Sequence, residues 1–367
     1  MSDNFHRHRA IKGQLLQLHP DASGRELQYL NVLSGLISGI VGSRHTSLPH
    51  VAAKIADGKR VKRESRVTQM SRLLRNDNFE QKAVFMPFAK TLLSSLAHTQ
   101  LVLVIDASQV GRGAMALVIS VVYGGRALPL GWLVVKAKKG HLTQSLHIRL
   151  LKQIHSLVPP DSQVVFLGDG EFDGCRLLRR LDYYGWKYVC RTAKNTKVWL
   201  DEDKQSQFSL CRLAVKEGKI VSLPNVAISK HEYGPVMVIA AWQRGYLEPI
   251  YLVTNLELER EAFWIYKKRF RIETFFSDQK SRGFRLDKSH MNEPQRLERL
   301  ILAACLAYLW LIYLGTVSIV EGWHKVFSRT HRVDLSLFQL GLNLLEYFLN
   351  EQMIIPVAFI PLLLEGL

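Results

Sequence analysis

Two aspartates, Asp106 and Asp169, each follow a short apolar segment with β-branched residues, LVLVI and QVVFLG. Such segments predict buried strands, and an acid at the end of one is costly to bury unless it binds a cation. Two such acids in one sheet can project to a shared point, where carboxylate oxygens suit Mg²⁺ and Mn²⁺. Pairs of these ions serve phosphodiester chemistry, one on the attacking oxygen and one on the leaving oxygen. The alternative is that each Asp caps the next turn.

A third acid, Glu273, lies in the segment YKKRFRIETFFSDQK. On a regular α-helix, with about 100° per residue, one stripe roughly 60° wide holds four polar residues: Tyr266, Arg269, Glu273 and Lys280. The stripe runs about 21 Å along the helix, long enough to pass several phosphates. We expect the acid to hold a metal ion while the phenol, guanidinium and ammonium grip the phosphates of a passing strand. The alternative is a surface helix with mixed charges.

The net charge of +17 over 367 residues favours a polyanionic partner, nucleic acid first and an anionic membrane second. A basic enzyme without such a partner is the alternative. The first 95 residues carry 15 Lys and Arg against 7 Asp and Glu, so part of the excess is concentrated there. Within that region we expect one group of basic residues to reach DNA phosphates rather than form a solvated helix face: Lys59, Arg60, Lys62, Arg63, Arg66, Arg72 and Arg75.

The pattern of apolar and polar residues divides the chain into five segments. They are a helical DNA-binding region, the first part of a catalytic core, a β-rich insertion, the second part of the core, and a C-terminal helical region that is a candidate for oligomerisation; their bounds are 1–95, 96–195, 196–255, 256–325 and 326–367. The first part of the core has the order three strands, helix, strand, helix, strand. That order predicts an α/β fold with a mixed sheet and covering helices.

One apolar run, residues 300–320, carries no charge and is long enough for a membrane helix of about 20 residues. It stands nearly alone and a dense run of charges precedes it, so we expect a helix buried in the protein core and no membrane partner. A single-pass membrane protein is the distant alternative. None of the four cysteines has CxxC spacing, and the N-terminus has no apolar signal core, so we expect reduced thiols in a cytoplasmic protein.

The residues Tyr266, Arg269, Glu273 and Lys280 match without a gap the signature Y-x2-R-x3-E-x6-K. In this the chain resembles the DDE transposases of bacterial insertion-sequence family four. The segments VIDAS, GDGEFDG, LVTNL and GFRLDKSH are similar to that family as well, and the resemblance covers roughly residues 30–320. It implies a ribonuclease-H-like mixed sheet with covering helices, interrupted by the β-rich insertion between the second Asp and the Glu.

The resemblance also implies a cut-and-paste reaction. Asp106, Asp169 and Glu273 would hold two Mg²⁺ ions, for which Mn²⁺ can substitute; water would cleave the transposon end, and the freed 3′-hydroxyl would attack the other strand or target DNA. The implied partners are double-stranded DNA, at terminal inverted repeats and at the target, and further copies of the chain on that DNA, at the bacterial nucleoid. Residues expected to contact DNA are Tyr266, Arg269 and Lys280 and, in the N-terminal region, Arg60, Lys62, Arg63 and Arg66.

One stretch departs from the family pattern. Relatives that form a hairpin on the transposon end place a Trp just before the LxTN strand, where it stacks on a flipped base, whereas this chain has EPIYLVTNL. Ile250 cannot stack in that way, so we expect either no hairpin or stacking on Tyr251 or Trp242; the alternative is that both aromatic rings pack the core of the insertion. Two other functions stay open: another ribonuclease-H-like DNA nuclease, and a non-catalytic DNA-binding derivative of a transposase.

Overall fold

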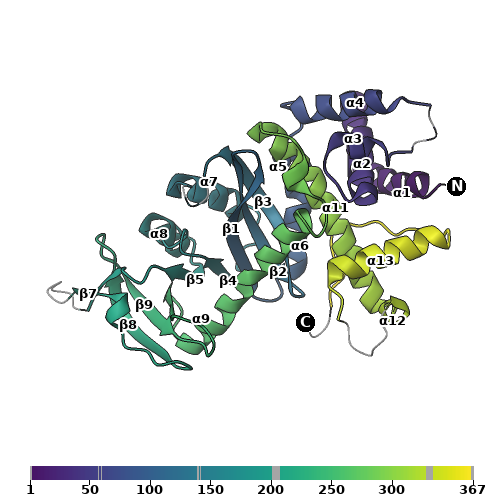
Figure 1. Ribbon diagram of the computed structural model, residues 1–367. Coiled ribbons are helices and arrows are strands. Elements are labelled where there is room, and N and C mark those ends of the chain that lie inside the picture. Colours follow the sequence, from purple (N-terminus) through teal and green to yellow (C-terminus); the bar gives the residue numbers. More distant parts are fainter. Residues whose placement is uncertain are drawn as a thin grey trace.

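The computed structural model describes residues 2–56, 58, 60–138, 140, 142–200, 207–327 and 334–364, and Figure 1 labels its elements. The described α-helices are α1 (Asp3–Leu18), α2 (Gly24–Ser43), α3 (Leu48–Ala52), α4 (Arg63–Arg75), α5 (Gln81–Val84), α6 (Met86–Leu96), α7 (Gln144–His155), α8 (Cys175–Tyr183), α9 (Glu259–Tyr266), α10 (Arg271–Gln279), α11 (Pro294–Val320), α12 (His324–Phe327) and α13 (Leu337–Asn350). Short 3₁₀ turns are η1 (Leu210–Arg212), η2 (Lys267–Phe270) and η3 (Leu286–Lys288).

The described strands form one sheet in the order β3-β2-β1-β4-β5-β10-β9-β8-β6-β7. Their bounds are β1 (Leu101–Gly111), β2 (Ala114–Tyr123), β3 (Arg126–Lys136), β4 (Val164–Gly168), β5 (Lys187–Thr192), β6 (Lys197–Trp199), β7 (Gln207–Ser209), β8 (Ile220–Ile228), β9 (Tyr233–Ala241) and β10 (Ile250–Thr254). β1, β4 and β5 run parallel, and the other neighbouring pairs are antiparallel. The large mixed sheet with covering helices is therefore as predicted. The β-like runs of the expected insertion extend this same sheet.

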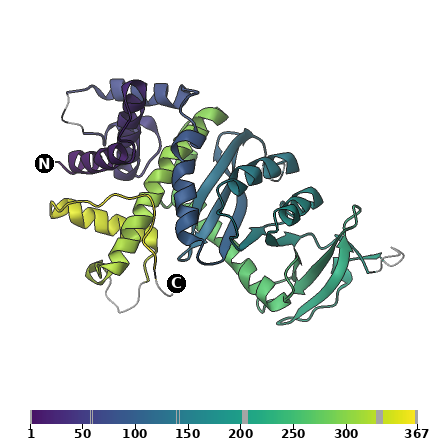
Figure 2. The same ribbon diagram turned by 180° about the vertical axis from the view of Figure 1, so that it is seen from behind.

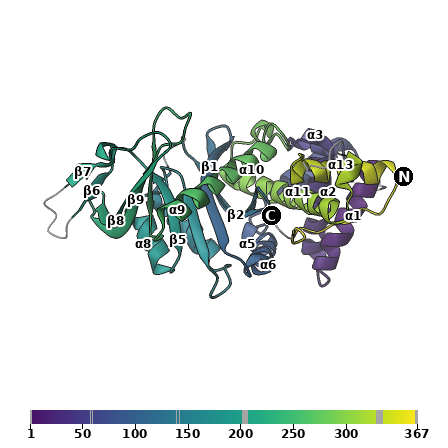
Figure 3. The ribbon, with the colours of Figure 1, turned by 90° about the horizontal axis from the view of Figure 1, so that it is seen from below.

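Helices cover both faces of the central strands. Gly131 of β3 lies under α7, where an added Cβ would come within 2.9 Å of Ile154. The next residue, Trp132, donates its indole N–H to the carbonyl of Glu298 on α11. Adjacent residues of a strand point to opposite faces, so α7 and α11 cover opposite sides of the sheet. Figure 3, seen from below, labels α10 and α11 beside β1 and β2.

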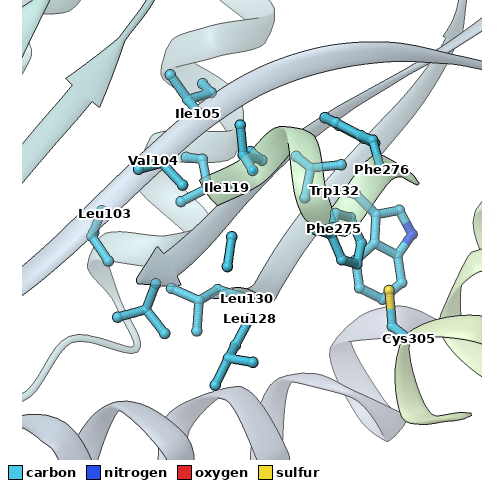
Figure 4. Packing of buried hydrophobic residues seen from close by; sticks show 14 of the residues in the cluster. Leu103, Val104, Ile105, Ile119, Leu128, Leu130, Trp132, Phe275, Phe276 and Cys305 are labelled. Carbon is cyan, nitrogen blue, oxygen red and sulfur yellow. The ribbon is translucent and has the colours of Figure 1, made fainter. Parts of the chain in front are cut away.

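The apolar core fills the space between the sheet and its helices. Figure 4 shows buried side chains of β1, β2 and β3 together with Phe275 and Phe276 of α10 and Cys305 of α11. The ring of Phe275 meets that of Tyr308 edge to face, with centroids 5.2 Å apart. Aromatic contacts of this kind add about 0.5–1.5 kcal/mol beyond burial. This packing sets the place of α10, which carries Glu273, relative to the strands.

The apolar segment of residues 300–320 lies in α11, the longest described helix. Among the described residues α11 alone is long and apolar enough to cross a membrane by length and composition, and 94% of its most apolar window is buried inside the protein. α13 covers part of it so closely that a Cβ on Gly315 would lie 2.1 Å from the carbonyl of Leu337. The segment is therefore a buried core helix, as predicted.

Helices α1 to α4 pack beside α11 and α13, at the end of the molecule away from β7 (Figure 2), whereas α6 lies against β3. Arg7 of α1 is buried there, with Nε 3.0 Å from the carbonyl of Ser38 and Nη2 3.2 Å from that of Lys54. Burial lowers the pKa of Arg7 to about 10, so it stays charged at neutral pH. The buried guanidinium of Arg7 therefore connects α1 to α2 and to the loop that contains Lys54.

Candidate active site

Asp106 lies within β1 and not at its end, which corrects the sequence-based expectation. The apolar run stops at Ile105, but β1 continues to Gly111 because β2 pairs with it along the hairpin, with Asp106 opposite Val118. On the other edge of β1, the parallel pairing with β4 extends only as far as Val104 and Leu167. Asp106 therefore has a strand neighbour on one side, and its side chain is only partly buried.

Asp169 directly follows β4, as predicted, and comes next to Asp106 through the strand register. The register that pairs Val104 with Leu167 would, if continued by two residues, pair Asp106 with Asp169. In parallel strands these positions face the same side of the sheet. The carboxylate of Asp169 accepts the N–H of Glu171 at 2.9 Å, which closes the turn that leaves β4. The two aspartates thus stand side by side where β4 ends.

Glu273 does not share one regular helix with the other signature residues, and this is a second correction. The 3₁₀ turn η2 separates α9 from α10 and holds Arg269, and Lys280 lies just past the end of α10. A 3₁₀ turn advances about 120° and 2 Å per residue, so neither the narrow stripe nor its 21 Å length applies. The turn instead places the Arg269 guanidinium beside β1.

Arg269 bridges two of the three acids. Its Nη2 donates to Oε1 of Glu273 at 2.8 Å, and its Nη1 lies 3.9 Å from Oδ2 of Asp106. The guanidinium is mostly buried, and its Nε has no hydrogen-bond partner among the described residues. Lys280 reaches the same strand by donating to the hydroxyl of Ser108. Signature residues therefore contact β1 from both ends of α10.

The electrostatics agree with a shared site. Burial raises the pKa of Asp106 to about 6, and the negative charges of Asp169 and Glu273 add to this rise. The N–H of Ala107 and the guanidinium of Arg269 act in the opposite direction. Charges change a pKa noticeably only over several ångströms. Asp169 and Glu273 therefore lie close to Asp106.

The metal ligation expected for these acids stays a prediction. Within the described ranges, no three His, Cys, Asp or Glu side chains lie close enough together to hold a metal ion. At this site Arg269 lies between Asp106 and Glu273. The donors themselves fit a hard divalent cation, because all three are carboxylates and a positive group already lies among them. Ligation by all three acids requires Arg269 to turn away from Glu273.

Tyr266, expected to grip phosphate, is 4% exposed. Burial raises the pKa of its phenol to about 12, while Arg269 and Arg191 lower it. Its hydroxyl therefore stays protonated at neutral pH and belongs to the polar surroundings of Asp169 rather than to an open surface. Tyr266 can therefore contact only DNA that enters the active site.

The N-terminal basic residues differ in how they are placed. Arg60 and Lys62 are exposed just before α4, and exposed Arg63 donates through Nη2 to the carbonyl of Pro49 at 2.6 Å. Arg66 is only 9% exposed, and its Nη1 donates to the carbonyl of Ile55 at 2.8 Å. Arg66 thus holds the segment before α4 and does not face solvent. Lys59 lies outside the described residues.

The two candidates for base stacking lie in the last antiparallel strands. Tyr251 of β10 is 7% exposed. Trp242, which follows β9, is half-buried and donates its indole N–H to the carbonyl of Tyr246 at 2.8 Å. Tyr251 belongs to the apolar core, as in the alternative kept open above. Stacking on a base would require Tyr251 to leave the core.

Sequence reasoning missed Ser108 and Phe270, which contact signature residues, and exposed Trp264 on α9. Ser108 binds Lys280, and its alternation with Asp106 in VIDAS was the available signal, since residues two apart share a strand face. Trp264 and Phe270 are 63% and 53% exposed. A cation lies over each ring: Lys267 Nζ is 3.8 Å from the Trp264 centroid, and Arg269 Cζ is 4.4 Å from that of Phe270. Exposed aromatics beside cations are typical of single-strand contacts.

A family model described as the transposase DDE domain matches residues 98–310. No curated protein matches the chain. One similar solved structure is a chain of the piggyBac transposase synaptic complex with hairpin DNA, with 12% identity and a TM-score of 0.45 over 99% of this chain and 85% of that chain. That likeness is too slight to support a statement about this chain. The family match covers more than half of the chain and includes all three acids, and the chain therefore belongs to the family of transposases with a DDE domain.

Proposed function

We propose that the protein is a cut-and-paste transposase of insertion-sequence family four that works at the bacterial nucleoid, in the cytoplasm. The proposal rests on one observation. Asp106, on β1, lies next to Asp169, which follows β4, and the Arg269–Glu273 pair lies beside them. The strand order β3-β2-β1-β4-β5, with β2 antiparallel to both neighbours, supports a ribonuclease-H-like core. The antiparallel strands from β6 to β10 are the insertion into that core.

DDE transposases generally use divalent metal ions. Here Asp106, Asp169 and Glu273 would hold two Mg²⁺ ions, or Mn²⁺ in their place, and the ions would activate water or a 3′-hydroxyl and stabilise the leaving oxygen. In the arrangement seen, Arg269 offsets the charge of Asp106 and Glu273. Once it turns from Glu273, its five N–H donors are available to a phosphate, to which guanidinium binds in a bidentate manner.

Double-stranded DNA is the proposed substrate, first at the terminal inverted repeats and then at the target. Support comes from the net charge of +17 and from the exposed cations Arg60, Lys62 and Arg63. Lys280, tied to Ser108, holds an ammonium beside the carboxylates, where the scissile phosphate would lie. A homo-oligomer on DNA would bring two ends together, which requires one active site for each end.

The test is an assay with supercoiled donor plasmid that carries the native element ends. Wild-type protein with Mg²⁺ should release the element and leave free 3′-hydroxyl ends. Asp106→Ala, Asp169→Ala and Glu273→Ala should each abolish cleavage, while gel shifts still detect binding to the ends, because phosphate contacts do not need the metal ligands. Cleavage that is not confined to the ends would favour another nuclease, and wild-type binding without cleavage would favour a non-catalytic derivative.

A further inference from the structure

A second polar cluster lies where the N-terminal helices meet the catalytic core. His45 follows α2 and its ring stacks on that of His50 in α3, with centroids 4.3 Å apart and planes 11° apart. The hydroxyl of Thr46 donates to the carbonyl of Arg285 at 3.2 Å, which fastens this loop to the turn around η3. His290 follows η3, and its charge lowers the pKa of His45. Segments far apart in sequence thus meet at one junction.

The cluster holds more positive than negative groups. His50, Arg285 and His290 are exposed, and His45 is half-buried. Burial first, then the charges of His50, Arg285 and His290, lower the pKa of His45, and Asp287 alone raises it. The remaining charged neighbour on the α3 side is Arg63, which bonds to Pro49. Guanidinium and imidazole groups therefore outnumber the acid Asp287 in this cluster.

The backbone is also unusual at this junction. Arg285 has φ 50° and His290 has φ 60°, both in the left-handed region that glycine adopts most readily. A side chain held there costs of order 1 kcal/mol, and such residues gather where a side chain must point in a set direction. Two strained side chains on one short turn are more than chain reversal needs, since glycine would turn the chain at lower cost.

A hollow of about 530 Å³ lies beside this junction and is lined by Gln109, Gly111, Arg112, Lys280, Ser281 and Asp287. Lys280 binds Ser108 of β1, and Asp287 lies in η3, two residues from Arg285. A chain of phosphates that leaves Lys280 along this hollow would next reach the turn of Arg285 and His290, to which the loop of His45 is fastened.

We propose that His45, His50, Arg285 and His290 form a phosphate clamp for the DNA strand that runs from the active site to the N-terminal region. The clamp rests on the proposed function, because DNA supplies its phosphates. Its donors are two of the kinds that bind phosphate best, guanidinium and imidazolium. A phosphate at the edge of the stacked rings offsets the repulsion between them when they are protonated, so binding brings protons with it.

This mechanism predicts a pH dependence. His45 accepts the Ser47 N–H through Nδ1 at 2.9 Å, which leaves Nε2 as its donor toward phosphate. Because the imidazolium form binds, affinity for DNA should rise as the pH falls from 8 to 6. The expected gain is at most about tenfold, the limit for one imidazole whose pKa rises by about one unit on binding.

Fluorescence anisotropy with a labelled duplex carrying the native end, at constant ionic strength, measures this gain. The variant with His45→Gln, His50→Gln and His290→Gln should bind like wild type at pH 8 and lose most of the gain at pH 6. Arg285→Gln should lower the slope of log affinity against log salt by about one at pH 8. The matched control, His155→Gln with His231→Gln, removes exposed histidines elsewhere and should keep the gain.

The outcomes separate the clamp from the proposed function. A triple variant with the full gain at pH 6 overturns the clamp while leaving DNA binding intact. A wild-type protein that binds no DNA at either pH overturns the proposed function as well. A third arm titrates inorganic phosphate into the protein and follows the histidine C2–H signals by NMR. Phosphate binding there, with DNA affinity unchanged in the triple variant, assigns the site to free phosphate and overturns the DNA assignment.

Discussion

The guanidinium of Arg126 and the carboxylate of Asp278 form a mostly buried ion pair, with Nη1 2.7 Å from Oδ2. Arg126 begins β3 and Asp278 lies on α10, so the pair ties the helix of Glu273 to the central hairpin. Burial raises the pKa of Asp278 to about 6, while Arg126 and Arg282 lower it, so the pair is ionised at neutral pH. Removal of one partner alone would leave a buried charge unpaired, so the stability of the fold depends on keeping or removing both.

Arg126→Met should lower the free energy of unfolding by about 3–5 kcal/mol, because it leaves a buried carboxylate unpaired. Arg126→Met combined with Asp278→Leu removes both charges and should recover most of that loss. Urea unfolding at pH 7.5 measures both variants. Arg112→Met, at the exposed β1–β2 turn, is the control and should change stability by less than about 0.5 kcal/mol. Equal losses in the single and double variants would contradict this account.

Arg269 should compete with metal ions for the acids. Arg269→Ala leaves Asp106 beside Asp169 and Glu273 without a neutralising cation, so we expect a lower Tm without metal and a larger rise in Tm with Mn²⁺ than in wild type. Arg269→Lys keeps the charge but loses the bidentate guanidinium, and cleavage should fall by about 10²-fold. Thermal unfolding with and without Mn²⁺ checks the first point. The same Mn²⁺ shift in both proteins would mean that Arg269 is no competitor.

His147 should make stability depend on pH. It is 0% exposed, neither ring nitrogen has a hydrogen-bond partner among the described residues, and burial lowers its pKa to about 4 from 6.5. Between these values the unfolded chain binds a proton that the folded chain does not, so the free energy of unfolding should rise as the pH rises from about 4 to 6.5. Urea titrations across that range should show a shallower rise in His147→Leu, and His231→Gln should keep the wild-type slope.

The exposed basic residues before α4 should contribute to the salt dependence of DNA binding. Replacing Arg60, Lys62 and Arg63 by Ala removes up to three phosphate contacts, and the slope of log affinity against log salt should fall by about one for each. Gel-shift titrations from low to high salt measure the slope. Arg66→Ala should instead lower stability, since its guanidinium bonds to Ile55. An unchanged slope in the triple variant would assign those three residues to a solvated face.

The hairpin step can be tested on the ends that the enzyme releases. If hairpins form by stacking on Tyr251 or Trp242, then Tyr251→Ala or Trp242→Ala should reduce them, because stacking contributes about 1–3 kcal/mol per base. Denaturing gels of the excised ends separate hairpins from open ends. Hairpins at wild-type levels in both variants would exclude both rings. Open ends from the wild type would show that the enzyme skips the step.

Most of the local structure could be predicted from the sequence. The β-branched runs before Asp106 and Asp169 and the helical spacing of the first 95 residues depend on near neighbours, so they can be recognised in the sequence alone. The signature residues also stand out by type and spacing. The errors came where pairing with another element changes the local structure, as β2 does when it prolongs β1 past Asp106.

Tertiary structure decided how the chemical groups meet. Strand register sets Asp106 beside Asp169, and it depends on hydrogen bonds between segments that no local pattern links. The 3₁₀ turn η2 turns Arg269 toward both Asp106 and Glu273, a geometry that ideal helix spacing does not contain. The sequence by itself determined which acids, cations and strands the protein has. Packing of distant segments decided which of them share a site, because those contacts gain their energy only when the whole core forms.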